Sequence, residues 1–247
     1  MCTLIFAWQV FEDAPVVVAA NRDEALGRPS HPPGRYSEDP PILAPWDEKV
    51  GGTWIGYNAS GVTAVITNRW IDRELDGERS RGLLVSDALE RESAEDAARF
   101  VEQSVEGFEY DGFNLVVIDE NAALLLEWDG SLRVRNFDPG IHIVVNVGAD
   151  GEFEIPASRS EFAERQAESA RRAMVDLRPE PGERSEEWHD RATEVLKNHD
   201  YGFCVHADEY GTRSSSLIRM GVDGSREYRF ADGPPCETTY EPIDQRP

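Results

Sequence analysis

Short apolar runs recur along the chain in blocks, and this grouping constrains the fold more than any other feature of the sequence. TLIFAWQV and VVVAA open the chain and are separated by FEDAP, whose Asp and Pro favour a turn, so a β-hairpin is predicted. TWIGYN and VTAVITN predict a second strand pair around 58–61, whereas residues 28–50, rich in Pro, Asp and Glu, are expected to form a long irregular excursion. Seven further strands are predicted from the runs FNLVVID, AALLLEW, SLRVRNF, IHIVVNV, YGFCVHA, SSLIRM and EYRFA.

Two pairs of predicted helices separate these blocks of strands. Apolar residues share one face at helical spacing in 82–91 and again in 94–105, where Ser93 is a suitable N-cap. Ser158 and Glu161 have the spacing of a capping box at the start of a third helix. The apolar faces of the third and fourth helices are expected to consist of Phe162, Ala170, Ala173, Met174, Trp188, Ala192, Val195 and Leu196.

The order of these elements indicates an α+β fold. Strands and helices do not alternate one by one, which argues against a doubly wound parallel sheet. Two mostly antiparallel sheets packed together, with a helical layer on each outer face, fit the pattern better, so we expect a four-layer α-β-β-α sandwich. A length of 247 residues allows either one large domain or two small ones, and we predict a single domain over 1–247.

The charge balance excludes whole classes of function. The chain has 48 Asp and Glu against 25 Lys and Arg, a formal charge of −23, which argues against binding to nucleic acid or to anionic membranes. An acid excess spread along the sequence is typical of proteins adapted to molar salt, where charge repulsion is screened. The sequence has no apolar stretch of membrane-spanning length and no leader-like N-terminus, so a cytoplasmic location is expected.

The three cysteines, Cys2, Cys204 and Cys236, are odd in number and widely spaced, so no disulfide framework is expected. His199, Cys204 and His206 do not have a standard zinc spacing, and no metal site is predicted.

Cys2 is the first candidate for chemistry. Removal of Met1 would give it a free α-amine, which can act as the base for its own thiol. If the first hairpin folds back, Arg22 reaches the level of Cys2 and lowers its pKa, and Asp23 can hold the α-ammonium. The same positions also fit a small buried cysteine and a surface ion pair.

Other polar residues lie where such a site would need them. Asn68 and Asn146 each end an apolar strand, where a side-chain amide can donate to a developing oxyanion or can simply form a turn. Arg213 lies at a loop-to-strand junction, as a site residue or as a surface cation. His142, inside an apolar strand, fits a core residue better than a base.

Eight short motifs, in order over residues 1–220, resemble the NRDE family, whose eukaryotic member is called transport and Golgi organisation protein 2. The motifs are MC, AANRDE followed by RP, GGTWIG, TN, RGLLV, YDGFNL, VVN and YGTRSSS. That resemblance implies the N-terminal-nucleophile hydrolase fold. It also implies a distant similarity to the choloylglycine hydrolase and penicillin V acylase group.

The resemblance implies a role for each matching residue. Cys2 would be the nucleophile, Arg22 would lower its pKa and Asp23 would orient the amine. Asn146 and Asn68 would line the oxyanion site, with Arg213 in support. Arg22 and Asp23 are adjacent, and adjacent strand residues point to opposite faces, so both reach Cys2 only if the strand has ended or bulged. Neighbouring residues of the motifs are expected to contact the ligand: Asn21, Glu24, Trp54 and Tyr210.

Two functions therefore remain open, beside a folded domain that retains no site. One is a hydrolase that cleaves a non-peptide amide or acyl bond through Cys2. The other is a non-catalytic binding or trafficking protein that holds haem, an acyl-coenzyme A or a lipid in the same pocket. In both, the partner is a small molecule, and no cofactor is required.

Overall fold

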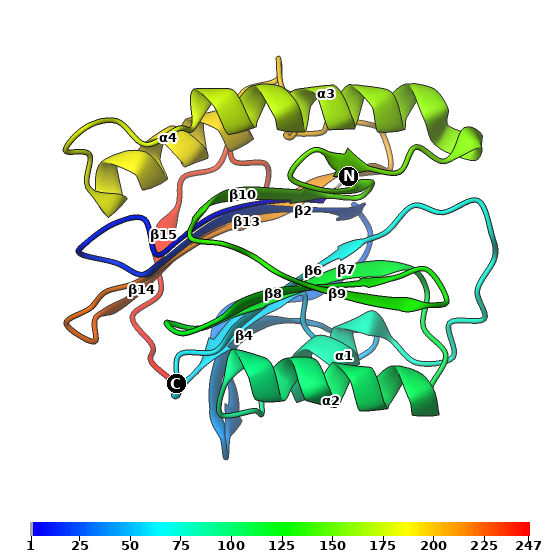
Figure 1. Ribbon diagram of the computed structural model, residues 1–247, viewed down its shortest axis with the longest axis horizontal. Helices are drawn as coiled ribbons and strands as arrows, with labels where there is room; N and C mark the ends of the chain where they lie inside the picture. The colour runs from blue at the N-terminus through cyan, green and yellow to red at the C-terminus, as the bar shows by residue number, and fades with distance from the viewer. Residues whose placement is uncertain (1) are drawn as a thin grey trace. The chain divides into compact units, whose positions relative to one another are not determined.

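The computed structural model describes residues 2–247, so the expected removal of Met1 concerns a residue outside the described range. The chain forms two compact units, which we describe separately. The first contains the chain up to Gly27 together with Pro139–Ile243, and the second contains Arg28–Asp138 and Asp244–Pro247. Each unit has one antiparallel sheet and two α-helices (Figure 1).

The sheet of the first unit is built around the predicted N-terminal hairpin. β1 and β2 pair antiparallel, with Thr3 opposite Asn21 and Trp8 opposite Val16. β10 flanks β1 and β13 flanks β2, so both hairpin strands are central and almost entirely buried. The order across the sheet is β12 (Glu152–Phe153), β11 (Gly148–Ala149), β10 (Gly140–Val145), β1 (Thr3–Trp8), β2 (Val16–Ala25), β13 (Tyr210–Met220), β14 (Arg226–Ala231) and β15 (Glu241–Pro242).

Helices α3 (Ser160–Asp176) and α4 (Ser185–Lys197) lie along one face of this sheet (Figure 1). The buried side of α3 consists mainly of alanines at helical spacing, which allows close packing on β10. The buried side of α4 contains the predicted Trp188, Ala192, Val195 and Leu196. A short 3₁₀ turn, η1 (Ala157–Arg159), precedes α3.

The sheet of the second unit is a meander, because its seven strands are ordered across the sheet as they are along the chain. They are β3 (Ser30–Glu38), β4 (Pro41–Asp47), β5 (Ile55–Asn58), β6 (Thr63–Asn68), β7 (Phe113–Ile118), β8 (Ala123–Trp128) and β9 (Leu132–Asn136).

Two helices, α1 (Arg81–Ala88) and α2 (Ala94–Gly107), pack on β6, β7 and β8 and enclose a continuous apolar core (Figure 1). Ser93 caps α2, as predicted, by accepting a hydrogen bond from the backbone N–H of Asp96.

Most of the predicted elements are confirmed, and four predictions about them are wrong. Phe162, predicted on the apolar face of α3, is exposed, because the buried side of this helix is formed by its alanines. Residues 28–50 contain β3 and β4 and are not an irregular excursion. The composition of this segment favours turns, but its backbone groups form hydrogen bonds between paired strands. Residues 201–207 are not a strand, and only His206 makes an isolated bridge, to Gly211. Ser158 does not cap α3, which begins after the 3₁₀ turn without a side-chain cap.

None of the helices described over residues 2–247 combines the length and the apolar character that crossing a membrane requires.

Candidate functional site

The first hairpin brings the NRDE segment back to the N-terminus of the chain. Thr3 pairs with Asn21, so the next residue of β2, Arg22, reaches the level of Cys2. This geometry follows from the turn at 9–15, which sets the register of two strands that are both buried. The sequence-based expectation that the hairpin returns to the level of Cys2 is therefore confirmed.

Two groups of the first unit hold the backbone and side chain of Cys2. Its nitrogen donates to Asn146 Oδ1 at 3.1 Å, and its Sγ lies 3.6 Å from the carbonyl oxygen of Asp23. Asn146 follows β10 directly, and β10 pairs with β1 so that Val145 lies opposite Thr3. The start of β1, the residue after β10 and Asp23 of β2 therefore meet at Cys2, which is half-buried and keeps a free thiol.

A hydrogen-bonded group of side chains surrounds Asp23. The Thr212 hydroxyl donates to Asp23 Oδ1 at 2.6 Å, and the Tyr210 hydroxyl donates to the Asp23 carbonyl oxygen at 3.2 Å. That carbonyl oxygen is also the one beside Cys2 Sγ, so Tyr210 lies next to the candidate nucleophile. Burial raises the pKa of Asp23, and the hydrogen bond from Thr212 opposes this rise.

Burial and the charge of Arg22 act on the pKa of Cys2 in opposite directions. Burial raises the pKa of the Cys2 thiol, and the charge of Asp23 adds to the rise. Arg22 lowers the pKa of Cys2, which is the direction expected from the sequence. Its effect is smaller than that of burial, so the pKa of Cys2 is raised overall.

Arg22 and Asp23 are both buried, although they are adjacent in β2. β2 neither ends nor bulges at these residues; the irregularity lies in β13, where the register shifts between Thr212 and Ser214. Arg213 is the additional residue of this bulge. Thr212 then pairs with Asp23 and Ser214 pairs with Arg22. Because of the bulge, a hydroxyl-bearing residue of β13 lies opposite each of the two charged residues.

The other expected residues of the NRDE segment have structural partners of their own. Asn21 is buried, and its Nδ2 donates to the carbonyl oxygens of Leu196 at 3.1 Å and Phe203 at 2.9 Å. This amide therefore fastens the chain after α4 to β2. Glu24 is half-buried, with Oε2 3.8 Å from Arg22 Nη2.

Two predicted site residues belong to the second unit. Asn68 ends β6 with an exposed side chain and pairs with Phe113 of β7. Trp54 is half-buried before β5, and its carbonyl oxygen accepts a hydrogen bond from the N–H of Ile66 at 2.9 Å. An oxyanion role for Asn68 and a ligand contact for Trp54 remain predictions.

Gln166 is a residue of the site that sequence reasoning missed. It lies on the buried, alanine-rich side of α3, and its Nε2 donates to Asn146 Oδ1 at 3.0 Å. Asn146 Oδ1 thus accepts from both Gln166 and Cys2, which fixes the orientation of the Asn146 amide. A lone polar residue on an otherwise apolar helix face was the available signal.

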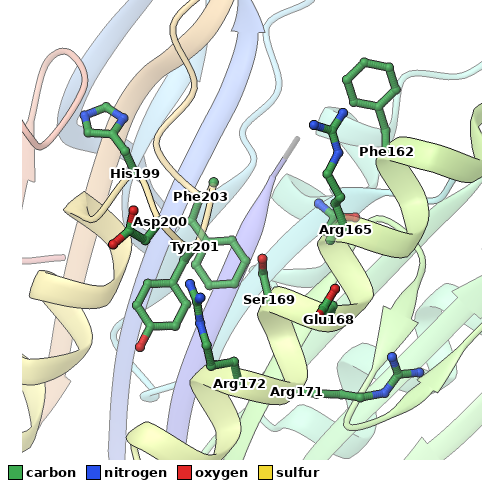
Figure 2. A pocket seen from close by; sticks show the side chains of 12 residues that line it. Phe162, Arg165, Glu168, Ser169, Arg171, Arg172, His199, Asp200, Tyr201 and Phe203 are labelled. Atoms are coloured by element: carbon green, nitrogen blue, oxygen red, sulfur yellow. The ribbon is translucent and has the colours of Figure 1, made fainter.

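A pocket of about 770 Å³ opens between α3 and residues 199–203 of the first unit. Figure 2 shows Arg165 and Arg172 projecting from α3, with Tyr201 and Phe203 on the other side of the pocket. Gln166 lines this pocket as well, so one hydrogen-bonded residue separates the pocket from Asn146. Arginines beside aromatic rings suit an anionic ligand that also has an apolar part.

Residues able to hold a metal ion lie in another part of the first unit. The structure brings together His199, Cys204, His206 and Cys236, although their sequence spacing matches no standard zinc motif. The fourth member comes from a distant segment, which is why spacing alone did not indicate the cluster.

The comparison of the sequence with protein families matches Transport and Golgi organisation 2 over residues 1–232. The Transport and Golgi organization protein 2 homolog of Bos taurus is 28% identical over 253 residues, covering 91% of this chain and 90% of the bovine protein. The homolog of Homo sapiens is 35% identical over 135 residues, covering 50% of this chain and 47% of the human protein.

Solved structures with a similar fold include two hydrolases. Penicillin V acylase from Agrobacterium tumefaciens superposes with a TM-score of 0.54 at 15% identity, over 94% of this chain and 83% of the acylase. The Caenorhabditis elegans N-acylethanolamine-hydrolyzing acid amidase ortholog gives 0.53 at 12% identity, over 88% and 92%. At such identities the likeness concerns the fold alone. This chain is a member of the Transport and Golgi organisation 2 family, and its antiparallel sheets and helices have the fold of the N-terminal-nucleophile hydrolases.

Proposed function

We propose that the protein is an N-terminal-cysteine hydrolase that cleaves a non-peptide amide or acyl bond of a small molecule. The observation that carries this proposal is the placement of Cys2: Asn146 holds its nitrogen and the Asp23 carbonyl faces its sulfur. An N-terminal nucleophile requires both atoms to be held, because one residue supplies the nucleophile and the base. The proposal also requires that Met1 be removed, so that the Cys2 nitrogen becomes an amine.

In the proposed reaction, the α-amine of Cys2 takes the proton of its own thiol. The sulfur then forms a bond to the carbonyl carbon of the substrate, and the carbonyl oxygen becomes an oxyanion. When the carbon–nitrogen bond breaks, the α-ammonium returns its proton to the departing amine. Water, deprotonated by the same α-amine, then attacks the thioester, releases the carboxylic acid and restores the thiol.

The surrounding residues have proposed roles in these steps. Because Asn146 Oδ1 accepts from Cys2 and Gln166, its Nδ2 is the atom that can donate to the oxyanion. Asp23 would accept a hydrogen bond from the α-ammonium. The positive charge of Arg22 would stabilise the thiolate and so offset part of the rise in pKa that burial causes. Tyr210 would contact the substrate.

The test is hydrolysis of a panel of N-acyl amides and acyl thioesters by tag-free protein. Cys2→Ala should abolish turnover, and Asn146→Ala should lower kcat about 100-fold or more while affecting KM less. Cys2→Ser keeps a small residue after Met1 and a nucleophile, and should retain a slow residual rate. Equal turnover by the wild type and Cys2→Ala would refute the proposal.

A second candidate function is the binding of haem, an acyl-coenzyme A or a lipid without catalysis. The pocket beside α3 favours it, because Arg165, Arg171 and Arg172 can neutralise propionates or phosphates while Tyr201 and Phe203 cover an apolar part. Replacing the three arginines by Gln should weaken binding at least about 10-fold, whereas Arg178→Gln, on an exposed residue outside the pocket, should not. Binding by the wild type and by Cys2→Ala alike, with no turnover of any panel substrate by the wild type, would favour this candidate.

A further inference from the structure

Two histidines and two cysteines converge at one end of the first unit. His199, Cys204 and His206 come from the segment between α4 and β13, and Cys236 comes from the segment between β14 and β15. Each offers one ligand atom, and the four atoms lie within 4.8 Å of one another. This convergence depends on the pairing of β13 with β14, which brings segments about thirty residues apart together.

Three distances within the cluster are close to, and slightly shorter than, those between the ligand atoms of a tetrahedral site. Cys204 Sγ lies 3.4 Å from Cys236 Sγ and 3.5 Å from His206 Nε2, and Cys236 Sγ lies 3.1 Å from the same nitrogen. In a tetrahedron with ordinary zinc bond lengths, the edges would be about 3.8 Å between sulfurs and about 3.6 Å between sulfur and nitrogen. If the three ligand atoms moved apart by up to about 0.5 Å, a zinc ion would fit between them at ordinary bond lengths.

The orientation of His206 is an independent observation. Its Nε2 faces the two sulfurs, while Nδ1, on the other side of the ring, lies 4.0 Å from Glu237 Oε1. Histidines that bind metals usually direct their second ring nitrogen to a carboxylate or carbonyl group, which fixes the ring. Glu237 is adjacent to Cys236, so one short segment places a thiol beside Nε2 of His206 and a carboxylate near its Nδ1.

We propose that His199, Cys204, His206 and Cys236 form a structural Zn²⁺ site. Two thiolates and two imidazoles in tetrahedral arrangement favour zinc over calcium, magnesium or manganese, which prefer oxygen ligands. Four protein ligands leave no open position for a substrate, which is the arrangement of structural sites. Binding releases the two thiol protons to solvent and involves no change of oxidation state.

The site would brace the segment that lies behind the candidate nucleophile. Phe203, beside Cys204, accepts a hydrogen bond from Asn21, and the N–H of Val205 donates to Thr212 Oγ1, which in turn donates to Asp23. His199, Tyr201 and Phe203 also line the pocket in Figure 2. Zinc would therefore hold one wall of this pocket and the residues that contact Asp23.

The first test measures zinc in tag-free protein that has been reduced, treated with chelator and reloaded with ZnCl₂. About one Zn²⁺ per chain should remain after gel filtration of the wild type. Cys204→Ser, Cys236→Ser and His206→Gln should each lose most of it. Cys2→Ser and His31→Gln, which alter a cysteine and a histidine outside the cluster, should keep it.

The second test requires no variant and so does not depend on the folding of one. Adding ZnCl₂ to the reduced, chelated wild type should raise Tm by several degrees and slow amide exchange in residues 198–209. Co²⁺ in place of Zn²⁺ should give the visible absorption of a tetrahedral thiolate complex. The proposal would be overturned by no retained zinc and no change in Tm after reduction, or by zinc retained equally by Cys204→Ser and Cys236→Ser. A Cys204–Cys236 disulfide that persists instead of metal uptake would also overturn it.

Discussion

At the scale of single residues, Thr212 connects the candidate site to the segment behind it. Its hydroxyl donates to Asp23 Oδ1 at 2.6 Å and accepts from the N–H of Val205 at 2.9 Å. The hydroxyl thus satisfies a buried carboxylate and a partly buried backbone group at once. Few side chains other than Thr and Ser can do both at this position.

Thr212→Val should lower the free energy of unfolding by about 1–3 kcal/mol, because it removes a donor to a buried carboxylate and an acceptor for a backbone N–H. The shape of the side chain is nearly unchanged, so the loss would report on hydrogen bonding. Urea unfolding measures the effect, and Thr212→Ser should recover most of the stability. If Thr212→Val is as stable as the wild type, the hydroxyl does not stabilise Asp23.

His189 is a second residue with a measurable electrostatic effect. It is buried in α4 and its Nε2 donates to the carbonyl oxygen of Val18 at 2.9 Å. Burial lowers the pKa of His189 from 6.5 to about 3. The folded state therefore binds a proton less readily than the unfolded state, and the stability that depends on neutral His189 is fully present above pH 6.5.

As the pH falls from 6.5 towards 3, this residue should cost the folded state about 1.4 kcal/mol per pH unit. His189→Gln, whose amide can still donate to Val18, should reduce the slope of unfolding free energy against pH by that amount. Urea unfolding at several pH values measures the difference. An identical slope in wild type and variant would show that His189 has the same pKa in the folded and the unfolded state.

Residue identity predicted part of the site. Cys2, Arg22, Asp23 and Asn146 were indicated by their positions near strand ends. The hairpin register brings Arg22 and Asp23 to the level of Cys2, and Asn146 joins them through its hydrogen bond with the Cys2 nitrogen. The net direction of the Cys2 pKa was not predictable, because it depends on how much of the thiol is buried. Gln166 was missed because a polar residue on a helix can face solvent as readily as a neighbour.

At the scale of elements, the short hairpin of β11 and β12 lies next to the site. Gly148 begins β11 two residues after Asn146, at φ = 133°, and an added Cβ would overlap the carbonyl oxygen of Glu152. Gly151 in the turn of the same hairpin has φ = 92°, with open space around its Cα. Both positions have a positive φ, but only Gly148 has an atom in the way of a Cβ. Comparing substitutions at the two positions therefore distinguishes the effect of steric overlap from that of backbone strain.

Gly148→Ala should destabilise the protein by more than about 2 kcal/mol, because the hairpin must shift to avoid the overlap. It should also disturb Asn146 and hence the contact to Cys2. Gly151→Ala should cost about 1 kcal/mol, from φ alone. Thermal unfolding of both variants tests the ranking, and equal losses would show that the overlap has no influence.

The elements that sequence reasoning missed share a physical cause. β3 and β4 contain proline, glycine and charged residues, so neither has the alternation of apolar and polar residues that identifies a strand. They form because β5 offers an edge to which β4 can add. Conversely, YGFCVHA is apolar enough for a strand, yet its backbone is used to hold Asn21 and Thr212.

At the scale of the whole molecule, the formal charge of −23 dominates the behaviour expected in solution. Carboxylates at this density repel one another in the folded state, and dissolved salt screens that repulsion within a few ångströms at molar concentration. Raising KCl from about 0.1 M to about 2 M should therefore raise Tm by several degrees. An unchanged or lower Tm at high salt would show that the acid excess does not limit stability.

The sequence also indicated the α+β class, the antiparallel sheets and the family. The grouping of strands and helices was sufficient for the class and the sheets, and the short motifs were sufficient for the family. The predicted block of four strands is nevertheless divided, with β7, β8 and β9 in one sheet and β10 in the other. The His199, Cys204, His206 and Cys236 cluster was not predictable, since it depends on which strands lie side by side and not on spacing along the chain.

In the proposed hydrolase, Cys2 becomes the N-terminal residue and reacts through its sulfur. Intact-mass analysis and peptide mapping of tag-free protein, after treatment with an electrophilic acyl probe such as a β-lactone, test both parts of this proposal. We predict a chain without Met1 that carries one label, located on Cys2 and absent from Cys2→Ala. A chain that retains Met1, or a label found only on Cys204 or Cys236, would contradict the claim.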